Sequence, residues 1–578
     1  MRASVRFAIT VAVATAVGMS GLGMAGANAS TTAVTACQTR PSAAGYVKAE
    51  NAKPGSTGWM YSTTRNTGLE AFANLTSASC GQMLRLMVST TAPTATVTAW
   101  RMGYYQGKGG RAVFTSDSFK TRVQAAAVTD PATRMRRAPW TTTLAMRIDG
   151  RFVPGSYVLK VTDSRGGQTY VPLTVQDPAS RTPLLVVSES LTWAAYNPWG
   201  GISAYSGYHG AADRALGASL DRPYDKNHGA ATYFTDEYPL IRLIEQNGLD
   251  AGYVTDVDVH DNPDLLQQHR GVLLGAHAEY WTAPMRYGFD AARGAGVNLA
   301  VLGANTGYWQ VRMQASNFGL NRAFAISRDA SLDPVTATVP QAATIRFRDL
   351  PAAQPEAKLI GQQYEGCPNV SGNMVLSAPA WPLPDLAAGT VLPLGVQQEF
   401  DRATPQTAPD SGYLQVLASS PLNCNGATTY ANVTYYTATS GAGVFSAGTI
   451  GWVCQLWGSA CPWGAGPTSA TTRAVFVATT ERLVRAMAAG PLGASHPSTA
   501  TGVPVAQVSS VVAGTGPTSG NADAHDSGCP SHRRKAAARP VPLDADDDDD
   551  DQDRDDGTLP TQLTSGIGAF RPWLPPSS

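Results

Sequence analysis

The stretch T-P-L-L-V-V-S at residues 182–188 marks a change in the hydrophobic pattern of the chain. Its nearly continuous apolar run is typical of a parallel strand that is buried on both faces. Three runs of the same kind follow, each succeeded by a polar loop and then by helical periodicity: Gly252–Thr255, Val272–Gly275 and Asn298–Gly303. This alternation of strands and helices predicts a parallel α/β domain over residues 182–490.

Helix-boundary residues locate several helices of this domain. Proline in a first turn and glycine after a last turn are common start and stop signals. They predict three helices: Pro239–Gln246 before Gly248, Thr282–Gly294 with Pro284 in its first turn, and Thr472–Met487 before Gly490. Between residues 305 and 450 the chain is rich in loops and scattered strands, whose order the sequence leaves open.

The preceding residues, from about 45 to 180, have a different pattern. Apolar residues alternate with polar ones, for example at Leu84, Leu86 and Val88, and turns such as Pro154-Gly155 separate the stretches. Period two with frequent turns predicts short antiparallel strands. The expected fold class is therefore α/β plus all-β, with an N-terminal antiparallel β-sandwich over residues 30–181.

Both ends of the chain differ in composition from the middle. Arg2 and Arg6 precede the apolar stretch Phe7–Val17, and Ala27-Asn28-Ala29 suits a signal peptidase, so residues 1–29 are expected to be a signal peptide. The protein is then expected to be secreted. Residues 491–578 are rich in small and polar residues and include the unbroken run Asp546–Asp551. Because such a segment buries too little apolar surface to offset its ordering entropy, a disordered tail is expected.

Six of the seven cysteines precede residue 490, and export makes disulfides the natural expectation for them. The close C-x-x-C pairs typical of zinc sites are absent. Cys37 with Cys80, and Cys454 with Cys461, are the suggested pairs among the 15 connectivities that six cysteines allow. Cys529 in the tail is left over.

Charge and length exclude some classes of function. The 578 residues contain 43 Lys and Arg against 43 Asp and Glu, and only 15% of residues are charged. The chain therefore lacks the overall excess of positive charge that would attract nucleic acid. No late apolar run reaches the length of about 18 residues that a membrane-spanning helix needs. Neither nucleic acid nor membrane is an expected partner.

The loops that follow the four apolar strands are the places to search for chemistry, because ligands of open parallel sheets bind beyond the carboxyl ends of the strands. Four loops are unusual in composition: T-W-A-A-Y-N-P-W-G-G-I-S-A-Y at 192–205, D-V-D-V-H-D at 256–261, A-H-A-E-Y-W at 276–281 and A-N at 304–305. The third carries His277 and Glu279, whose side chains suit metal ligation or proton transfer. No G-x-S-x-G occurs in the chain, so a serine hydrolase has little support.

With these motifs the mature chain resembles the large (beta) subunit of N,N-dimethylformamidase and the family that shares its C-terminal domain. The resemblance rests on T-W-x-A-Y-N, G-G-x-S-x-Y, D-x-D-x-H, G-x-H-x-E-Y-W and G-x-N, together with W-R-M-G-Y-Y-x-G at 100–107. It implies a flavodoxin-like, class I glutamine-amidotransferase-like α/β domain. The nucleophilic cysteine of that fold has no counterpart among residues 276–280, and the resemblance implies a mononuclear ferric iron, Fe3+, in its place.

The resemblance also implies roles for individual residues. Tyr196, Tyr205 and Glu279 match the iron ligands, with Tyr208 or Tyr224 as alternatives to Tyr205. His277, Asn305 and Glu399 match active-site positions beside the metal. Three hard anionic oxygen ligands would neutralise a trivalent ion and leave positions for water and substrate.

Other interpretations remain open at this point. The aromatic cluster around Tyr196 and Tyr205 also suits a protein core or a sugar-stacking surface. Asp256, Asp258 and His260 would form a second metal site, or instead hydrogen-bond to loop backbones. The leading hypothesis is a secreted metal-dependent hydrolase that cleaves the C–N bond of a small-molecule amide. An oligomeric form of this hydrolase is possible. The alternative is a non-catalytic exported protein that binds carbohydrate or cell wall.

Overall fold

The apolar run after Pro183 forms strand β13 (Leu184–Ser188), all of whose residues are buried. It pairs in parallel with β15 (Ala251–Thr255) on one side and with β16 (Gly271–Leu274) on the other. The sheet continues in parallel through β18 (Asn298–Val301) to β27 (Gly443–Ser446). Along the sheet the parallel strands therefore lie in the order β15, β13, β16, β18 and β27. Numbered by their order in the sequence this is 2-1-3-4-5, so the strand order reverses between β13 and β16.

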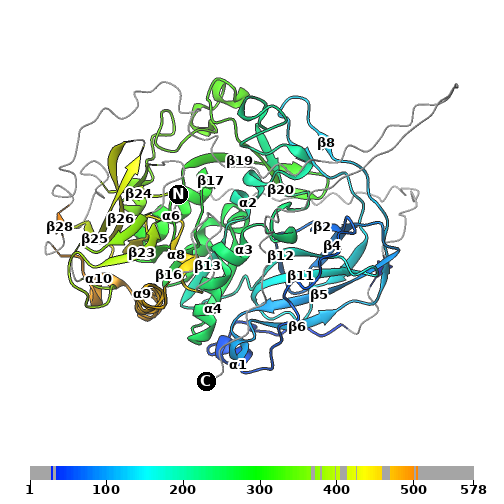
Figure 1. Cartoon of the computed structure of the whole chain (residues 1–578), viewed down its shortest axis with the longest axis horizontal. Helices are drawn as coiled ribbons and strands as arrows, with labels where there is room; N and C mark the ends of the chain where they lie inside the picture. Colours follow the sequence, from blue (N-terminus) through cyan, green and yellow to red (C-terminus); the bar gives the residue numbers. More distant parts are fainter. Residues whose placement is uncertain are drawn as a thin grey trace, which may run out of the picture. The chain divides into compact units, whose positions relative to one another are not determined.

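This computed structural model describes residues 28–29, 34–365, 372–377, 380–396, 399–403, 413–424, 426–457, 469–499 and 503–504. All of them fall within one unit that spans Met1–Cys529, which Figure 1 shows from one side. The α/β plus β class that the sequence predicts is confirmed. The boundary expected near residue 181 stays a prediction.

Three antiparallel strands extend the parallel sheet beyond β27. They are β26 (Ala427–Thr437), β25 (Gln415–Cys424) and β28 (Val503–Pro504). The first two form a long hairpin, and β26 also pairs with β27. The loop-rich stretch that the sequence leaves unordered thus supplies three strands of an eight-stranded sheet, β25, β26 and β27, whereas β28 comes from beyond residue 490.

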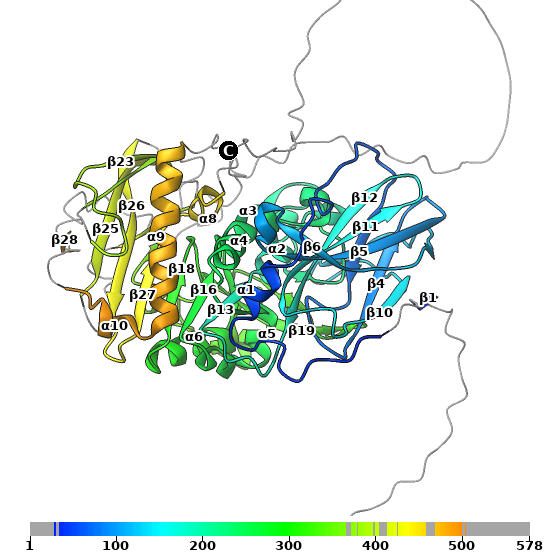
Figure 2. The same cartoon turned by 90° about the horizontal axis from the view of Figure 1, so that it is seen from below.

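Helices cover both faces of this sheet (Figure 2). Alternate residues of β13 enter two different cores: Leu184 and Val186 pack with apolar residues of α4 and α9, whereas Leu185 and Val187 pack with those of α6. The three helices that the sequence predicts lie close to their expected bounds, at α4 (Tyr238–Gln246), α6 (Ala283–Gly294) and α9 (Ala470–Ala489). The other α-helices are α1 (Tyr46–Asn51), α2 (Ser190–Tyr196), α3 (Tyr233–Asp236), α5 (Asp256–Asp261), α7 (Ala357–Ile360), α8 (Trp452–Gln455) and α10 (Leu492–Ser495).

Two mostly antiparallel sheets precede the α/β part. One contains β1 (Asn28–Ala29), β10 (Leu144–Arg147), β4 (Met83–Ser89) and β2 (Glu70–Ala73) in that order. The other contains β3 (Ser77–Ser79), β12 (Gln168–Gln176), β11 (Gly155–Asp163), β5 (Thr94–Met102) and β6 (Gly110–Thr115), with β7 (Phe119–Lys120) paired to β5. Residues of both sheets, such as Leu84 and Val97, share one hydrophobic core. The alternating apolar residues of the sequence therefore point inward as predicted.

Four smaller sheets or hairpins complete the described structure. A four-stranded sheet contains β14 (Gly217–Ser219), β20 (Gly319–Ala325), β19 (Trp309–Ser316) and β17 (Tyr280–Thr282). The two-stranded pairs are β8 (Val128–Thr129) with β9 (Arg136–Arg137), β21 (Gln363–Tyr364) with β24 (Asp401–Arg402), and β22 (Gly372–Val375) with β23 (Val391–Val396). Among the described residues, no helix is long and apolar enough to cross a membrane.

A buried ion pair joins the N-terminal sheets to the α/β part. Arg101 of β5 meets Glu245 of α4 through two hydrogen bonds of 2.7 and 2.8 Å, and both side chains are fully buried. Tyr253 of β15 donates a third hydrogen bond to the same carboxylate, at 2.7 Å. Each charge of the pair is therefore stabilised by its partner from the other part of the chain and not by water.

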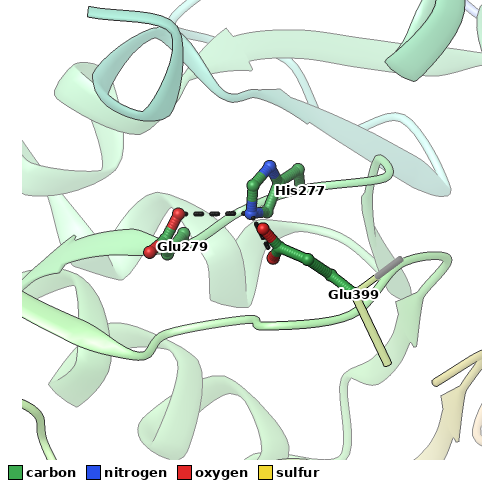
Figure 3. A group of neighbouring side chains, drawn as sticks. All are labelled: His277, Glu279 and Glu399. Atoms are coloured by element: carbon green, nitrogen blue, oxygen red, sulfur yellow. Dashed lines mark ion pairs between the residues drawn. The ribbon is translucent and has the colours of Figure 1, made fainter. Parts of the chain in front are cut away.

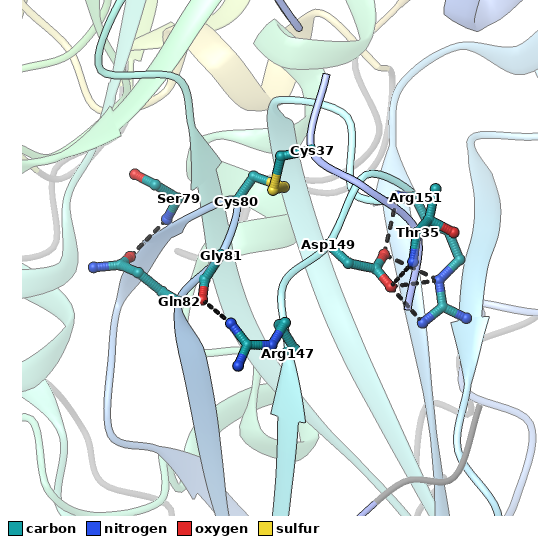
Figure 4. The surroundings of a disulfide bond; sticks show 9 residues. All are labelled: Thr35, Cys37, Ser79, Cys80, Gly81, Gln82, Arg147, Asp149 and Arg151. Atoms are coloured by element: carbon teal, nitrogen blue, oxygen red, sulfur yellow. Dashed lines mark hydrogen bonds and ion pairs between the residues drawn. A yellow bond between two sulfur atoms is a disulfide. The ribbon is translucent and has the colours of Figure 1, made fainter. Parts of the chain in front are cut away.

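The expected disulfide between Cys37 and Cys80 is present and ties the segment before α1 to the turn after β3 (Figure 4). Cys424 and Cys454 are also disulfide-bonded, whereas Cys461, the suggested partner of Cys454, lies outside the described residues. Regular structure continues past residue 490, because α10 and β28 fall where the sequence predicts the tail to begin. The rest of that tail and nearly all of the expected signal peptide lie outside the described residues, so both stay predictions.

Candidate metal centre and active site

Two neighbouring strand ends bring the candidate residues together. Strand β13 runs into the short helix α2, whose last residue is Tyr196. Strand β16 ends at Leu274, and the turn that follows carries His277 and Glu279 before β17 begins. Because β13 and β16 are adjacent and parallel, both turns leave the sheet at the same edge. This is the point where the strand order reverses, and open α/β sheets bind ligands at such points.

Two glycines allow the turns to approach one another closely. A Cβ atom on Gly275 would lie 2.7 Å from the carbonyl oxygen of Asp236 and 2.8 Å from the carboxylate of Glu189. A Cβ atom on Gly303 would lie 2.0 Å from the carbonyl oxygen of Ala276, a distance that no real side chain tolerates. The glycines of G-x-H and G-x-N therefore let the turn after β18 lie directly against the turn after β16.

The oxygens of Tyr196 and Tyr205 converge on the carboxylate of Glu279. Tyr196 Oη donates to Glu279 Oε2 at 2.8 Å, and Tyr205 Oη lies 2.8 and 2.9 Å from the two carboxylate oxygens. The two phenol rings stack with their centroids 4.1 Å apart. Of the alternatives to Tyr205, Tyr208 is 66% exposed and donates to the carbonyl oxygen of Gly200, away from this carboxylate.

His277 and Glu399 form the other side of the same cluster (Figure 3), and Asn305 adjoins Glu399. His277 Nε2 lies 3.2 Å from Glu279 Oε2 and 2.9 Å from Glu399 Oε2, close enough for an ion pair with each but without the angles of a hydrogen bond. Asn305 Nδ2 donates to Glu399 Oε2 at 2.8 Å. Glu399 Oε1 also lies 3.4 Å from Tyr196 Oη. All six residues that the sequence singles out therefore belong to one connected group, although their roles stay predictions.

The donor set fits a small, highly charged cation. Ligand atoms of His277, Glu279 and Glu399 all lie within 4.8 Å of one another, and the two phenol oxygens border the same carboxylate. Ligands at about 2.0–2.2 Å from one ion and at right angles to each other are about 2.8–3.1 Å apart. The measured oxygen–oxygen distances of 2.8 and 2.9 Å have that spacing. Phenol and carboxylate oxygens are also the hard donors that a trivalent ion prefers.

Burial and charge shift the protonation of the cluster. Burial, together with the charges of Glu279 and Glu399, raises the pKa of Tyr196 well above 10. Without a cation this phenol therefore keeps its proton, and a bound cation has to displace it. Burial lowers the pKa of His277, but the charges of Glu399 and Glu279 outweigh it and hold that pKa well above its ordinary value. The imidazole is thus a proton donor at neutral pH.

Buried acids hold the turns from behind. Glu189 Oε2 accepts from the backbone N–H of His277 at 3.1 Å, and Glu237 Oε1 accepts from the backbone N–H of Glu189 at 2.8 Å. Burial raises the pKa of Glu237 to about 8 and that of Glu189 well above 4.5. These carboxyl groups therefore support the site largely in their neutral forms.

Asn305 is fixed in an uncommon backbone conformation. Its φ is +56°, in the left-handed region that asparagine tolerates better than most residues. Its N–H donates to Asp401 Oδ1 at 2.8 Å, while its own Oδ1 is buried without a hydrogen-bond partner. The sequence predicts that Asn305 stabilises an oxyanion; in the structure one N–H of its amide is already engaged by Glu399, so only the second remains for that role.

The second metal site considered at Asp256, Asp258 and His260 is not formed. These residues lie on α5 rather than on a strand end, and Asp258 caps that helix through Thr255. Asp256 accepts from Ser190 and from the N–H of Leu191, and His260 contacts Thr282 at 2.9 Å. Within the described ranges, one group of His, Cys, Asp and Glu side chains is suited to a metal, and it consists of His277, Glu279 and Glu399.

Sequence reasoning missed three members of the cluster. Tyr280, directly after Glu279, contacts Tyr205 Oη through its own hydroxyl. Arg328 donates to Tyr280 Oη at 2.6 Å and lies 4.0 Å from the ring centroid of Tyr205. Lys226 lies 6.0 Å from the ring centroid of Tyr196. Tyr280 belongs to the motif G-x-H-x-E-Y-W, from which it could have been selected as a candidate. No local sequence pattern connects residues 226 and 328 to the site.

A pocket opens beside the cluster. Tyr196 and His277 line it, together with Trp193, Tyr224, Lys226 and Asp236. A small molecule in this pocket would therefore contact one candidate metal ligand, Tyr196, and the candidate proton donor, His277. The pocket also explains where Tyr224 lies: it forms part of the wall and makes an edge-to-face contact with Trp193.

Comparisons with known proteins agree with these motifs. No curated protein sequence matches the chain significantly. One solved structure in the comparison is that of a Paenibacillus sp. cycloisomaltooligosaccharide glucanotransferase complexed with cycloisomaltoheptaose. Its sequence is 7% identical, and the alignment covers 63% of this chain and 68% of that chain. The TM-score of 0.15 is too low to indicate a common fold. The family model described as N,N-dimethylformamidase beta subunit-like, C-terminal, matches residues 96–463, which is more than half of the chain. The chain therefore belongs to the N,N-dimethylformamidase beta subunit-like, C-terminal family.

Proposed function

We propose that the protein is a secreted hydrolase that uses one ferric ion to cleave the C–N bond of a small amide. The family is consistent with an amidohydrolase-type activity. The observation that carries the proposal is that two phenols from the segment after β13 and one imidazole from the turn after β16 all meet the carboxylate of Glu279. A hydrophobic core or a sugar-binding surface needs no such convergence on a buried carboxylate.

Tyr196, Tyr205 and Glu279 would hold the ion. Two phenolates and one carboxylate carry three negative charges, which match the charge of Fe3+. When bound, the ion would polarise the amide carbonyl and make water a stronger nucleophile at neutral pH. The turn after β16 has no cysteine or serine at residues 276–280, so such activation would stand in for a covalent nucleophile.

The remaining residues move protons during hydrolysis. Water adds to the carbonyl carbon and gives up one proton, for which Glu399 is the acceptor. His277 lies 2.9 Å from Glu399 and donates a proton to the leaving nitrogen, so that the C–N bond breaks to give a carboxylic acid and an amine. The free N–H of Asn305 stabilises the developing negative charge on the carbonyl oxygen, while its other N–H holds Glu399 in place.

We further propose that the two N-terminal sheets form a β-sandwich and that the α/β part is flavodoxin-like and similar to class I glutamine amidotransferases. The shared core of the two sheets supports the first statement. The order of the parallel strands, 2-1-3-4-5 in their own sequence, supports the second, because it is the order of flavodoxin-like folds. The apolar leader and the disulfide Cys37–Cys80 support export.

Metal content and hydrolysis test the proposal together. We expect purified protein to contain one iron per chain and to show a visible tyrosinate-to-iron absorption band. Tyr205→Phe should lose the band and the hydrolysis of short N-alkyl amides, whereas the control Tyr208→Phe, on the same loop but directed away from Glu279, should retain both. Colourless protein without iron, or equal effects of the two variants, would overturn the proposal.

A further inference from the structure

We propose that Tyr280 and Arg328 form a hydrogen-bond relay that fixes the Tyr205 oxygen and sets how strongly it donates electrons to a bound iron. The inference rests on the proposed function, because it takes Tyr205 to be an iron ligand. Neither residue belongs to the predicted ligands or proton-transfer groups. Both are positioning residues, since they act through Tyr205 and do not contact the pocket.

The direction of the relay follows from counting hydrogens. An arginine side chain only donates, so Tyr280 Oη accepts from Arg328 Nη2, at 2.6 Å. A carboxylate only accepts, so the single hydroxyl hydrogen of Tyr205 goes to Glu279, at 2.8 Å. The contact between the two tyrosine hydroxyls can then be made in one way, with Tyr280 donating to Tyr205.

The relay is held rigidly. Tyr280 is 1% exposed and lies in β17, which pairs in parallel with β19. The guanidinium of Arg328 lies 4.0 Å from the ring centroid of Tyr205 and 5.1 Å from that of Trp309. The backbone of Arg328 has a φ of +61°, in the left-handed region that non-glycine residues seldom adopt.

The relay would act on a bound metal through Tyr205. When a cation replaces the hydrogen of Tyr205, the hydrogen bond from Tyr280 remains and draws electron density from the same oxygen. The positive charge of Arg328 above the ring acts in the same direction. Both effects reduce donation from the ligand to the metal, so the tyrosinate-to-iron transition needs more energy than it would without the relay.

Tyr280→Phe tests the inference in the full-length, iron-loaded protein. We expect the tyrosinate-to-iron band to move to longer wavelength. Because the Tyr205 oxygen is no longer held in place, we also expect the iron dissociation constant to rise about 10–100-fold, the usual effect of losing a partner behind a metal ligand. Tyr308→Phe is the matched control, because Tyr308 also lies beneath an arginine, Arg348 at 4.9 Å, while its ring packs against Trp309 and Tyr364. Arg328→Met provides a second variant with the same expected direction, should Tyr280→Phe fold poorly.

The outcomes separate the inference from the function on which it rests. Wild-type protein without iron would overturn both. Iron and its band in the wild type, with the same band position and affinity in Tyr280→Phe and Arg328→Met, would overturn the relay and leave the hydrolase proposal standing. A shift in both variants and none in Tyr308→Phe would support the relay.

Discussion

Replacing Glu245 by glutamine tests how strongly the N-terminal sheets depend on the α/β part. The substitution changes the size of the side chain little but removes its charge. Arg101 would then lose its counter-charge while remaining fully buried, with the carbonyl oxygen of Pro154 and the hydroxyl of Tyr105 as its remaining partners. The site around Glu279 is untouched by this change.

The expected loss of stability is large. Removing one partner of a buried ion pair typically costs about 3–5 kcal/mol, because the other charge is left uncompensated. The entropy of unfolding grows with chain length, so each kcal/mol lowers the Tm of a unit of this size by about 1–2 °C, and we expect a decrease of roughly 5 °C in Tm. Scanning calorimetry measures this value, and the visible band or metal content shows whether the site survives.

Two further variants make this result interpretable. Asp290→Asn removes a carboxylate that is 35% exposed and pairs with Arg286; a loss of about 0–1 kcal/mol is expected, because Arg286 keeps the carbonyl oxygens of Gln354 and Pro355 as partners. Replacing Arg101 and Glu245 together by methionine and leucine should recover part of the stability, because neither charge of the pair remains, although the hydroxyl of Tyr253 loses its acceptor. A Tm for Glu245→Gln within one degree of the Asp290→Asn value would refute the account of this pair.

Three other predictions concern pH, the disulfide and the active-site asparagine. Burial raises the pKa of Glu237 from 4.5 to about 8, so the folded protein binds this proton more tightly than the unfolded chain does. The contribution of Glu237 to stability is therefore full below pH 4.5 and is lost as the pH rises toward 8. Tm should fall over this range in the wild type and less in Glu237→Gln, and equal slopes of Tm against pH would contradict this. Replacing Cys37 and Cys80 by alanine opens a loop with a sequence separation of 43, which should cost about 3–4 kcal/mol in the free energy of unfolding, and an unchanged Tm would show that the bridge contributes nothing. Asn305→Asp keeps the backbone conformation but places a second negative charge beside Glu399, so kcat should fall about 10–100-fold. Tm should also fall, because the new carboxylate is buried, whereas wild-type kcat would exclude a role for the amide.

The sequence predicts the central sheet well because its buried parallel strands have a strong local pattern. The runs at β13, β15, β16 and β18 appear within two residues of their expected bounds, and glycine and proline mark the ends of α4, α6 and α9. The hairpin of β25 and β26 was not predicted, because its addition to the edge of a parallel sheet depends on pairing with β27 and not on local periodicity. Regular structure extends past residue 490, since Leu492 is fully buried in α10, and the bounds of the tail stay a prediction.

The candidate site was predictable where residues stand in motifs at strand ends, and not where distant segments complete it. His277 and Glu279 follow β16 directly, and the motif match located Tyr205 despite a short spacing from Tyr196. Arg328 reaches Tyr205 from a residue beyond β20, and only the tertiary structure brings the two together. The engagement of the Asn305 amide by Glu399 likewise depends on a packing of loops that no spacing indicates.

X-ray diffraction at the iron absorption edge tests the central claim most directly. Crystals of the iron-containing protein should give one anomalous peak at bonding distance from Tyr196 Oη, Tyr205 Oη and the carboxylate of Glu279, with His277 beside it and unbound. A peak bonded instead to His277 and Glu399, or no peak near these side chains, would contradict the assignment of two phenols and one carboxylate as the metal ligands.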